Sequence, residues 1–184
     1  MYNPSEDTFF IADTIVNYNG NCALEIGIGS GYLTDILCKN YKFVLGTDID
    51  FASVKHSKYF LNKFNNKFLI CCDVCEPIRC LFDIIISNPP YLPSNGENIK
   101  DKAIYGGQTG IEITLRILQL FKSNLKDEGK IIFVKSSLSD DKKLNQFVEK
   151  NLLQKRTLAK KKYFYEMLEI CEITKTKTKT KKYD

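Results

Sequence analysis

The chain has 184 residues, of which 43% are apolar and 27% are charged, and this size and composition are typical of a single globular domain. The last ten residues, KTKTKTKKYD, carry five lysines and one aspartate, so the rest of the chain holds 22 basic and 21 acidic residues. Such a near-neutral body is unlike a protein that holds a nucleic-acid duplex by its phosphates. The sequence has neither a signal peptide nor an apolar run near the roughly 18 residues of a membrane helix. We therefore expect a cytoplasmic protein that does not contact membranes, and a nuclear presence stays open.

Seven cysteines invite a disulfide or metal interpretation, but the count is odd. Cys71, Cys72, Cys75 and Cys80 lie close together, and only Cys72 and Cys75 have C-x-x-C spacing. A structural zinc site usually needs a second pair or two histidines, whereas the chain has one histidine, His56. We predict no metal site, reduced thiols buried in strands, and His56 on the surface of a helix.

The first half of the chain alternates apolar strands and amphipathic helices. The predicted strands are Cys22–Ile26, Phe43–Gly46, Phe68–Cys72 and Phe82–Ser87. The predicted helices between them are Tyr32–Lys39, after a glycine-rich turn, and Phe51–Asn65.

The second half continues the alternation. We expect a helix over Ile111–Leu125, a turn at Asp127-Glu128-Gly129, a strand over Lys130–Val134, a helix over Asp140–Leu152 and a final strand over Tyr163–Ile173. Strands separated by helices predict an α/β fold with a mainly parallel sheet covered on both faces. We predict one domain over residues 1–174 and a frayed Lys/Thr tail over residues 175–184. Ligands of such sheets bind beyond the carboxyl ends of the strands.

A glycine-rich turn follows the first strand, in Glu25-Ile-Gly27-Ile-Gly29-Ser-Gly31-Tyr. Glycines let the backbone approach a ligand, but G-x-G-x-G is not the G-x-G-x-x-G of dinucleotide binders. Asp48 ends the next strand, about 20 residues further on, at the offset of a carboxylate that accepts hydrogen bonds from ribose. Asp50 we expect to cap the following helix.

Two more carboxylates complete this group. Asp73 follows the third strand, where it either reaches an adenine edge or simply ends the strand, and Glu25 precedes the glycines. An acidic lining repels phosphates and suits a cation. Together with Gly27, Gly29 and Asp48, these residues predict an adenosine cofactor without a pyrophosphate, for which S-adenosylmethionine is the best candidate.

The fourth strand ends in Asn88-Pro89-Pro90-Tyr91. A planar NH₂ group has two N–H donors, and the Asn88 side-chain oxygen and the Pro89 carbonyl could accept both of them. Proline fixes the backbone angles and adds no competing donor, while Tyr91 offers a flat face for the planar group. These four residues are the predicted catalytic residues. Positioning of the amine would then supply much of the rate.

These motifs, taken together, resemble class I amino-methyltransferases. The stretches E-I-G-x-G-S-G, T-D-I-D and S-N-P-P-Y carry that resemblance, and P-S-E-D-T-F at Pro4–Phe9 narrows it to the HemK-related archaeal and eukaryotic release-factor glutamine methyltransferases. The resemblance covers roughly residues 2–173. It implies a Rossmann-like, mainly parallel seven-stranded sheet with helices on both faces.

The resemblance also implies roles for particular residues. The cofactor pocket would be closed by Thr8, lined by Glu25, Gly27, Asp48, Asp73 and Val74, and touched by Asn88. The implied substrate is the glutamine of a Gly-Gly-Gln motif in a peptide chain release factor. The implied partner is a small zinc-binding activator subunit, and the apolar stretch Phe68–Cys71 is where we expect it to bind.

Some alternatives stay open. The acceptor could be an adenine amine of DNA or RNA, or a protein lysine, or the chain could be a cofactor-binding subunit without catalysis. Nucleic acid is disfavoured by the near-neutral body and the lack of a base-reading domain. A lysine needs a general base, and the sequence shows no dedicated one. The chain's own Gly106-Gly107-Gln108 we interpret as part of a flexible loop over the substrate pocket.

Overall fold

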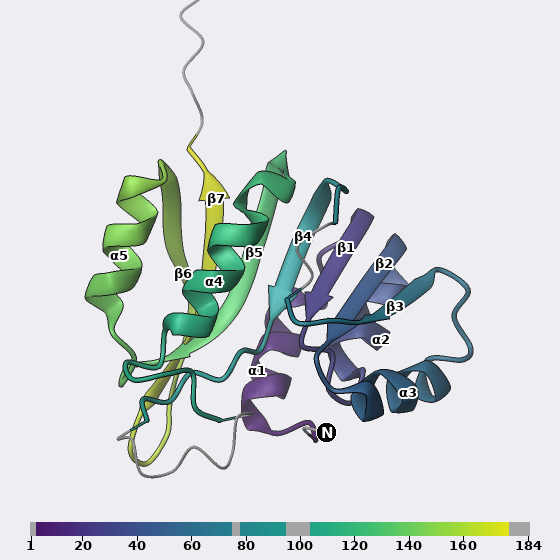
Figure 1. The fold of residues 1–184 in the computed structure, drawn as a ribbon, viewed down its shortest axis with the longest axis horizontal. Coiled ribbons are helices and arrows are strands. Elements are labelled where there is room, and N and C mark those ends of the chain that lie inside the picture. Colours follow the sequence, from purple (N-terminus) through teal and green to yellow (C-terminus); the bar gives the residue numbers. More distant parts are fainter. Residues whose placement is uncertain (1–2, 75–77, 95–103, 177–184) are drawn as a thin grey trace, which may run out of the picture.

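The part of the chain that the structure describes contains seven strands, which form one sheet in the order β3-β2-β1-β4-β5-β7-β6 (Figure 1). The computed structural model describes residues 3–74, 78–94 and 104–176. The strands are β1 (Gly20–Ile26), β2 (Tyr41–Asp48), β3 (Lys67–Cys71), β4 (Phe82–Ser87), β5 (Leu125–Ser136), β6 (Leu153–Lys162) and β7 (Met167–Lys175). The pairs from β3 to β5 are parallel, whereas β7 runs antiparallel to both β5 and β6. The predicted mainly parallel sheet is confirmed.

Helices cover both faces of this sheet. They are α1 (Glu6–Ile15), α2 (Tyr32–Asn40), α3 (Phe51–Phe60), α4 (Glu112–Phe121) and α5 (Asp141–Lys150), and a short 3₁₀ helix, η1 (Lys122–Asn124), follows α4. Residues of α4 and α5 pack with one face of the sheet, and residues of α1 and α2 pack with the other (Figure 1). Among the helices of the described residues, none is both long and apolar enough to span a membrane.

The three consecutive isoleucines of β4 show why this strand has no polar face. Ile85 packs into the core beneath α4 and α5, while Ile84 and Ile86 pack into the core beneath α1 and α2. All three are at most 1% exposed. Because side chains alternate between the faces of a strand, a sheet covered on both sides needs apolar residues at every position.

The strand order reverses between β1 and β4. Ile26, the last residue of β1, pairs with Ser87, the last residue of β4. The glycine-rich turn and Asn88 therefore begin side by side, at the topological switch point where open α/β sheets bind their ligands. Figure 1 shows the arrowheads of β1 and β4 at the same edge, next to α1.

The end of the sheet differs from the prediction. The final strand expected over Tyr163–Ile173 corresponds to β7, which runs from Met167 to Lys175, but the prediction missed β6, which forms an antiparallel hairpin with it. β6 is rich in lysine and has no apolar run that would indicate a strand. Its lysines suit an exposed edge strand, since charge blocks pairing with other chains, and one of them, Lys160, lies 2.7 Å from Glu169 of β7. β7 ends at Lys175, and residues 177–184 of the predicted tail lie outside the described residues.

The turn predicted at Asp127-Glu128-Gly129 is wrong, because these residues belong to β5. α4 ends at Phe121 and η1 ends at Asn124, so the strand starts earlier than expected. The pairing between β4 and β5 shifts register after Phe82. A Cβ on Gly129 would lie 2.6 Å from the Phe82 carbonyl oxygen, so this glycine permits a close approach of two strands rather than a reversal.

Smaller differences concern a helix and the thiols. α3 ends at Phe60, five residues before the predicted end, where Leu61 leaves the helical conformation. The prediction of buried strand thiols is wrong for Cys71 and Cys80, which are exposed, and Cys75 lies outside the described residues. His56 is exposed on α3, as predicted.

Candidate active site

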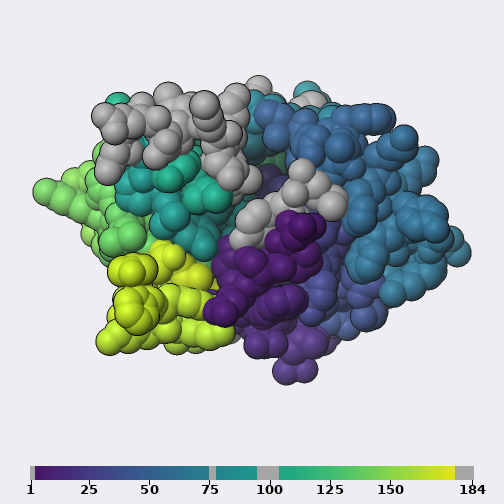
Figure 2. All heavy atoms as spheres, turned by 90° about the horizontal axis from the view of Figure 1, so that it is seen from below, coloured from purple at the N-terminus to yellow at the C-terminus, as the bar shows by residue number. Residues whose placement is uncertain are grey.

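A pocket of about 760 Å³ opens at the switch point, between α1, the glycine-rich turn and the ends of β2 and β4. In Figure 2 this edge of the sheet faces the viewer, with α1 in purple between the turn of the β6–β7 hairpin and the region of α3. The pocket brings together nine of the predicted site residues: Thr8, Glu25, Gly27, Gly29, Asp48, Asn88, Pro89, Pro90 and Tyr91.

The glycine-rich turn forms one wall of the pocket. Gly27, Gly29 and Gly31 have φ of +81°, +49° and +85°, in the left-handed region that glycine adopts without strain. The Gly29 N–H donates to Asp48 Oδ2 at 2.8 Å, and the Asp50 N–H donates to Asp48 Oδ1 at the same distance. The Asp48 carboxylate thus fixes the turn to the end of β2 and keeps lone pairs for further donors.

The predicted capping role of Asp50 is confirmed. Its side chain accepts a hydrogen bond from the Ala52 N–H at 3.0 Å and another from the Ser53 hydroxyl at 2.9 Å, at the start of α3. Asp50 also lines the pocket.

Glu25 is the most buried acid of this wall, with 2% of its surface exposed. The Thr34 hydroxyl donates to its carboxyl group. Burial, and to a smaller extent the nearby Asp48 charge, raise the pKa of Glu25 to about 8 against the lowering effect of the Thr34 hydrogen bond. A cation that entered the pocket would favour the ionised form and lower this pKa.

Asn88 forms the opposite wall, at the end of β4. Its Nδ2 donates to Thr8 Oγ1 at 3.4 Å. Its Oδ1 is fully buried and has no hydrogen-bond partner among the described residues. A buried acceptor without a partner is costly unless a ligand supplies the donor.

Tyr91 is held at both ends. Its hydroxyl donates to Asp7 Oδ2 at 3.2 Å, and its carbonyl oxygen accepts from the Ser139 hydroxyl at 2.8 Å. The first bond connects the tyrosine to α1 and the second to the loop after β5. The ring orientation is therefore set by two elements that are distant in sequence.

Residues 104–110 form a loop beside the pocket, which Ile104 lines, and backbone hydrogen bonds join this loop to the segment after Asn88. The Gly106 N–H donates to the Leu92 carbonyl at 3.0 Å. A Cβ on Gly106 would lie 2.2 Å from the Pro90 carbonyl oxygen, so only glycine permits this contact. The expected unusual backbone is found at Gly107, with φ of +109°. The loop thus contacts the backbone of Pro90 and Leu92. Residues 95–103 lie outside the described residues.

Two predicted cofactor residues lie away from the pocket. Asp73 Oδ1 accepts from Arg116 Nη1 of α4 at 2.8 Å, in an ion pair whose side chains are both about half exposed. Val74 has φ of +42°, which is strained for a β-branched residue, and packs against the core beneath α4. Neither Asp73 nor Val74 lines the switch-point pocket.

The sequence prediction missed Asp7, which lines the pocket and is 5% exposed. Its neighbour Thr8 drew attention only through the resemblance. Further lining residues that were not predicted are Asn3, Pro4, Ile28, Ser30, Tyr32, Leu33, Ile49, Ser53, Leu92 and Ile104. Among the described residues, no group of three or more His, Cys, Asp or Glu side chains could hold a metal ion.

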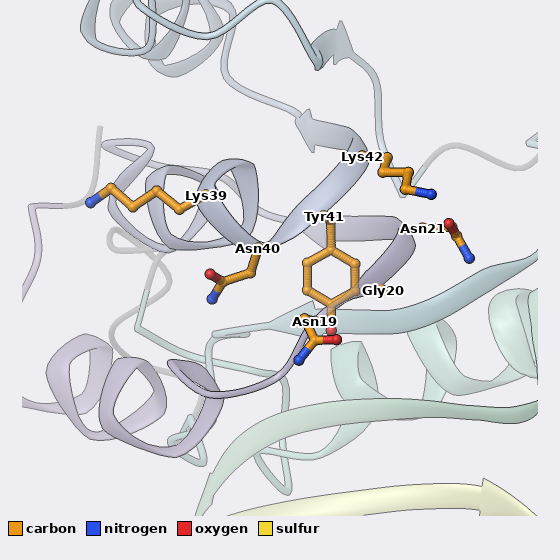
Figure 3. Close-up of a pocket in the computed structure, with 7 residues that line it drawn as sticks. All are labelled: Asn19, Gly20, Asn21, Lys39, Asn40, Tyr41 and Lys42. Carbon is orange, nitrogen blue, oxygen red and sulfur yellow. The ribbon is translucent and has the colours of Figure 1, made fainter.

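A second hollow, of about 470 Å³, lies at the other end of the strands, where β1 and β2 begin (Figure 3). Its lining residues are Asn19, Gly20, Asn21, Lys39, Asn40, Tyr41 and Lys42. Figure 3 shows the Lys39 and Lys42 side chains pointing away from each other. None of the seven carries a carboxylate, and the switch-point pocket is the better candidate for chemistry.

Comparison with known proteins agrees with this geometry. The model of the methyltransferase small domain family matches residues 6–168. The chain belongs to this family. Its seven-stranded, mostly parallel sheet is the Rossmann-like fold of class I methyltransferases.

Relatives narrow the similarity. The chain is 35% identical, over 77% of its length and 75% of the relative's, to a Methanocaldococcus jannaschii chain named as a protein N5-glutamine methyltransferase. It is 28% identical, over 70% of its length and 69% of the relative's, to the catalytic subunit mtq2 of the Schizosaccharomyces pombe eRF1 methyltransferase. The resemblance to glutamine methyltransferases is confirmed.

A solved structure has the same fold. The Mtq2–Trm112 complex of E. cuniculi, responsible for methylating the translation termination factor eRF1, contains a chain that matches this one with a TM-score of 0.76 and 22% identity. The match covers 95% of this chain and 98% of that chain.

Proposed function

We propose that this enzyme transfers a methyl group from S-adenosylmethionine to the side-chain amide of the glutamine in the Gly-Gly-Gln motif of a peptide chain release factor. The observation that carries this proposal is the buried Asn88 Oδ1, which has no partner among the described residues and lies in the pocket. This oxygen can accept a hydrogen bond from an N–H group of the substrate. Similarity to a protein N5-glutamine methyltransferase and to the catalytic subunit of an eRF1 methyltransferase supports glutamine as the source of that donor.

The proposed cofactor side is the wall formed by Glu25, Gly27, Gly29 and Asp48. S-adenosylmethionine, when bound, supplies an electrophilic methyl group on a positively charged sulfur. Glu25 and Asp48 would favour that positive charge, and an Asp48 oxygen has lone pairs left for ribose hydroxyls. The left-handed glycines leave the backbone uncovered at the place where the cofactor would lie.

The proposed roles of Asp73 and Val74 depend on a rearrangement. For Asp73 to reach the adenine edge, it would have to leave Arg116, and an exposed ion pair is worth at most about 1 kcal/mol. Thr8 is proposed to close the pocket next to the cofactor. The resemblance to release-factor glutamine methyltransferases supports these roles.

The proposed substrate side is Asn88-Pro89-Pro90-Tyr91. Asn88 Oδ1 and the Pro89 carbonyl would accept the two N–H bonds of the glutamine amide and hold its plane against the Tyr91 ring. One N–H proton is lost to water as the new N–C bond forms and the S–C bond breaks. Asn88 and Pro89 orient the nitrogen, and no side chain of the pocket needs to act as a strong base.

We also propose that a small zinc-binding activator subunit covers the edge strand β3. Phe68 and Ile70 of this strand are 51% and 40% exposed, and Phe68 stacks on Phe43 with ring centroids 4.7 Å apart. An uncovered apolar edge strand favours association with another chain. A heterodimer would explain this surface, and the relative's complex with Trm112 supports it.

The remaining proposals concern organisation and location. We propose one methyltransferase domain over residues 1–174, with a tail over residues 175–184, in a protein that works in the cytoplasm with the translation machinery. Adenine-amine methylation is less well supported, because the body of the chain is near neutral.

A transfer assay with labelled cofactor tests the proposed function. Purified release factor, a histone-like peptide and DNA would be offered separately, each with and without the activator subunit. Label on the release factor, increased by the activator, is the expected result. Label on DNA or on the lysine peptide alone would replace the proposed acceptor with an adenine or a lysine amine.

A further inference from the structure

The orientation of the Asn88 amide decides whether the pocket offers an acceptor or a donor. An asparagine amide can be rotated so that its oxygen and nitrogen exchange places with little change of shape. In the described arrangement Nδ2 faces Thr8 and Oδ1 is the buried group without a partner among the described residues. The reverse orientation would present two N–H groups to an incoming NH₂, which cannot accept them well.

The Thr8 hydroxyl has all three of its hydrogen-bonding positions occupied. A hydroxyl donates once and can accept twice. Thr8 Oγ1 donates to Asp7 Oδ1 at 3.3 Å and accepts from the Ser5 N–H at 3.4 Å. The remaining acceptor position takes the N–H of Asn88. As long as the Thr8 proton points to Asp7, the group that faces Thr8 must be the amide nitrogen.

The direction of the Thr8 hydroxyl proton therefore depends on Asp7. The Asp7 carboxylate accepts from the Ser5 hydroxyl at 2.5 Å and the Thr8 N–H at 2.6 Å, in addition to the Thr8 hydroxyl. Its second oxygen accepts from the Tyr91 hydroxyl at 3.2 Å. Four donors converge on one buried carboxylate, as expected of an ionised group that can only accept.

One carboxylate thus connects to both ends of the catalytic segment. It reaches Asn88 through Thr8, and it reaches Tyr91 directly. Nothing in its position requires contact with the reacting atoms, since the contacts run through neighbouring side chains.

We propose that Asp7 is a positioning residue, which fixes the amide of Asn88 through the Thr8 hydroxyl so that Oδ1 faces the substrate, and which holds the Tyr91 ring. This inference rests on the proposed function for the identity of the substrate. The direction of the amide does not depend on it.

The first test uses Asp7→Leu, which has a similar size and cannot accept. The Thr8 proton is then free to turn toward Asn88 Oδ1, which allows the amide to rotate. We expect kcat to fall about 100-fold, as for a displaced reacting group, while the Kd of S-adenosylmethionine is unchanged. Asp13→Asn, an exposed change on the same helix, is the matched control. Wild-type kcat for Asp7→Leu would overturn the proposal.

A second pair of variants distinguishes a loss of positioning from misfolding of α1. Thr8→Val removes the hydroxyl but keeps Asp7 and its bond to Tyr91, so it should lower kcat by no more than Asp7→Leu does. Thr8→Ser keeps the hydroxyl and should restore most of the activity. The double variant Asp7→Leu/Thr8→Val should be no slower than Asp7→Leu alone, because Thr8 orients the Asn88 amide only through its bond to Asp7. If kcat of the double variant falls by the product of the two single-variant factors, Asp7 and Thr8 do not act through one connection.

A structural readout separates this inference from the choice of substrate. In protein with labelled asparagine side chains, the Asn88 Nδ2 protons should show a nuclear Overhauser contact to the Thr8 methyl group in the wild type. The contact should disappear in Asp7→Leu and persist in Asp13→Asn. If it persists in Asp7→Leu, Asp7 does not set the amide. If the wild type methylates no release factor yet shows this behaviour, the proposed function fails and the positioning role stands.

Discussion

Asn88 Nδ2 lies 3.4 Å from Thr8 Oγ1, although 80 positions separate the two residues along the chain. The contact joins α1 to the end of β4 and leaves Asn88 Oδ1 as the buried acceptor of the pocket. The proposed chemistry depends on this acceptor more than on any acid or base.

Asn88→Ala should remove this acceptor without disturbing the cofactor wall. We expect kcat to fall by a factor of about 100 or more, the usual effect of losing one positioned hydrogen-bonding group. Calorimetry should give an unchanged Kd for S-adenosylmethionine. The control is Asn145→Ala, at a partly exposed asparagine of α5 that does not line the pocket. Near-normal turnover of release factor by Asn88→Ala would remove Asn88 from the proposed catalytic role.

Asp48→Ala should act on the other wall. The variant loses the bonds from the Gly29 and Asp50 N–H groups and the proposed ribose contact. Hydrogen bonds to a charged group contribute about 1.5–3 kcal/mol, so the Kd of S-adenosylmethionine should rise roughly 10- to 100-fold. Asp127→Ala, at an exposed aspartate of β5, should leave the Kd unchanged. An unchanged Kd for Asp48→Ala would show that the cofactor does not use this carboxylate.

The raised pKa of Glu25 predicts that cofactor binding depends on pH. With a pKa of about 8, only about one tenth of the Glu25 carboxyl groups are ionised at pH 7 in the empty pocket. A cationic ligand prefers the ionised form, so its affinity should rise by up to about tenfold between pH 7 and pH 9. Glu25→Gln should remove this contribution and leave only the pH dependence that comes from the amino group of the ligand. Equal slopes in the two proteins would exclude Glu25 as the titrating group.

The same group affects stability in the opposite direction. The pKa of Glu25 in the folded protein, about 8, lies above its ordinary value of 4.5. The free energy of unfolding should therefore fall as the pH rises from about 4.5 to about 8. Urea unfolding of the wild type and of Glu25→Gln at several pH values would measure the difference in free energy of unfolding between the two proteins, which should narrow as the pH falls from about 8 to about 4.5 and stay constant below that. A difference that is constant with pH would contradict the assigned pKa.

Ile70→Asp tests the proposed partner surface. A charge on the exposed edge strand β3 should weaken binding of the activator subunit, measured by titration of the two purified chains. Leu152→Asp introduces the same charge at an exposed leucine that precedes β6, at the opposite edge of the sheet. Equal binding by both variants would place the partner elsewhere.

The sequence predicted well those parts of the protein that depend on local pattern. The isoleucines of β4, the glycines after β1 and the strand-end Asp48 each have a nearby signal, and parallel topology brings their ends together. β6 escaped prediction because its lysines suit an exposed edge rather than a core. Asp7 escaped because its partner Tyr91 lies 84 positions away, and only the folded chain brings them together.

The central claim is that the acceptor is the glutamine of a Gly-Gly-Gln motif. Tandem mass spectrometry of release factor, after incubation with the enzyme, its activator and S-adenosylmethionine, locates the methyl group directly. We predict one added methyl group on that glutamine side chain, and none when the glutamine of the release factor is replaced by alanine. A methyl group on a lysine, or an unmodified release factor beside methylated nucleic acid, would contradict the claim.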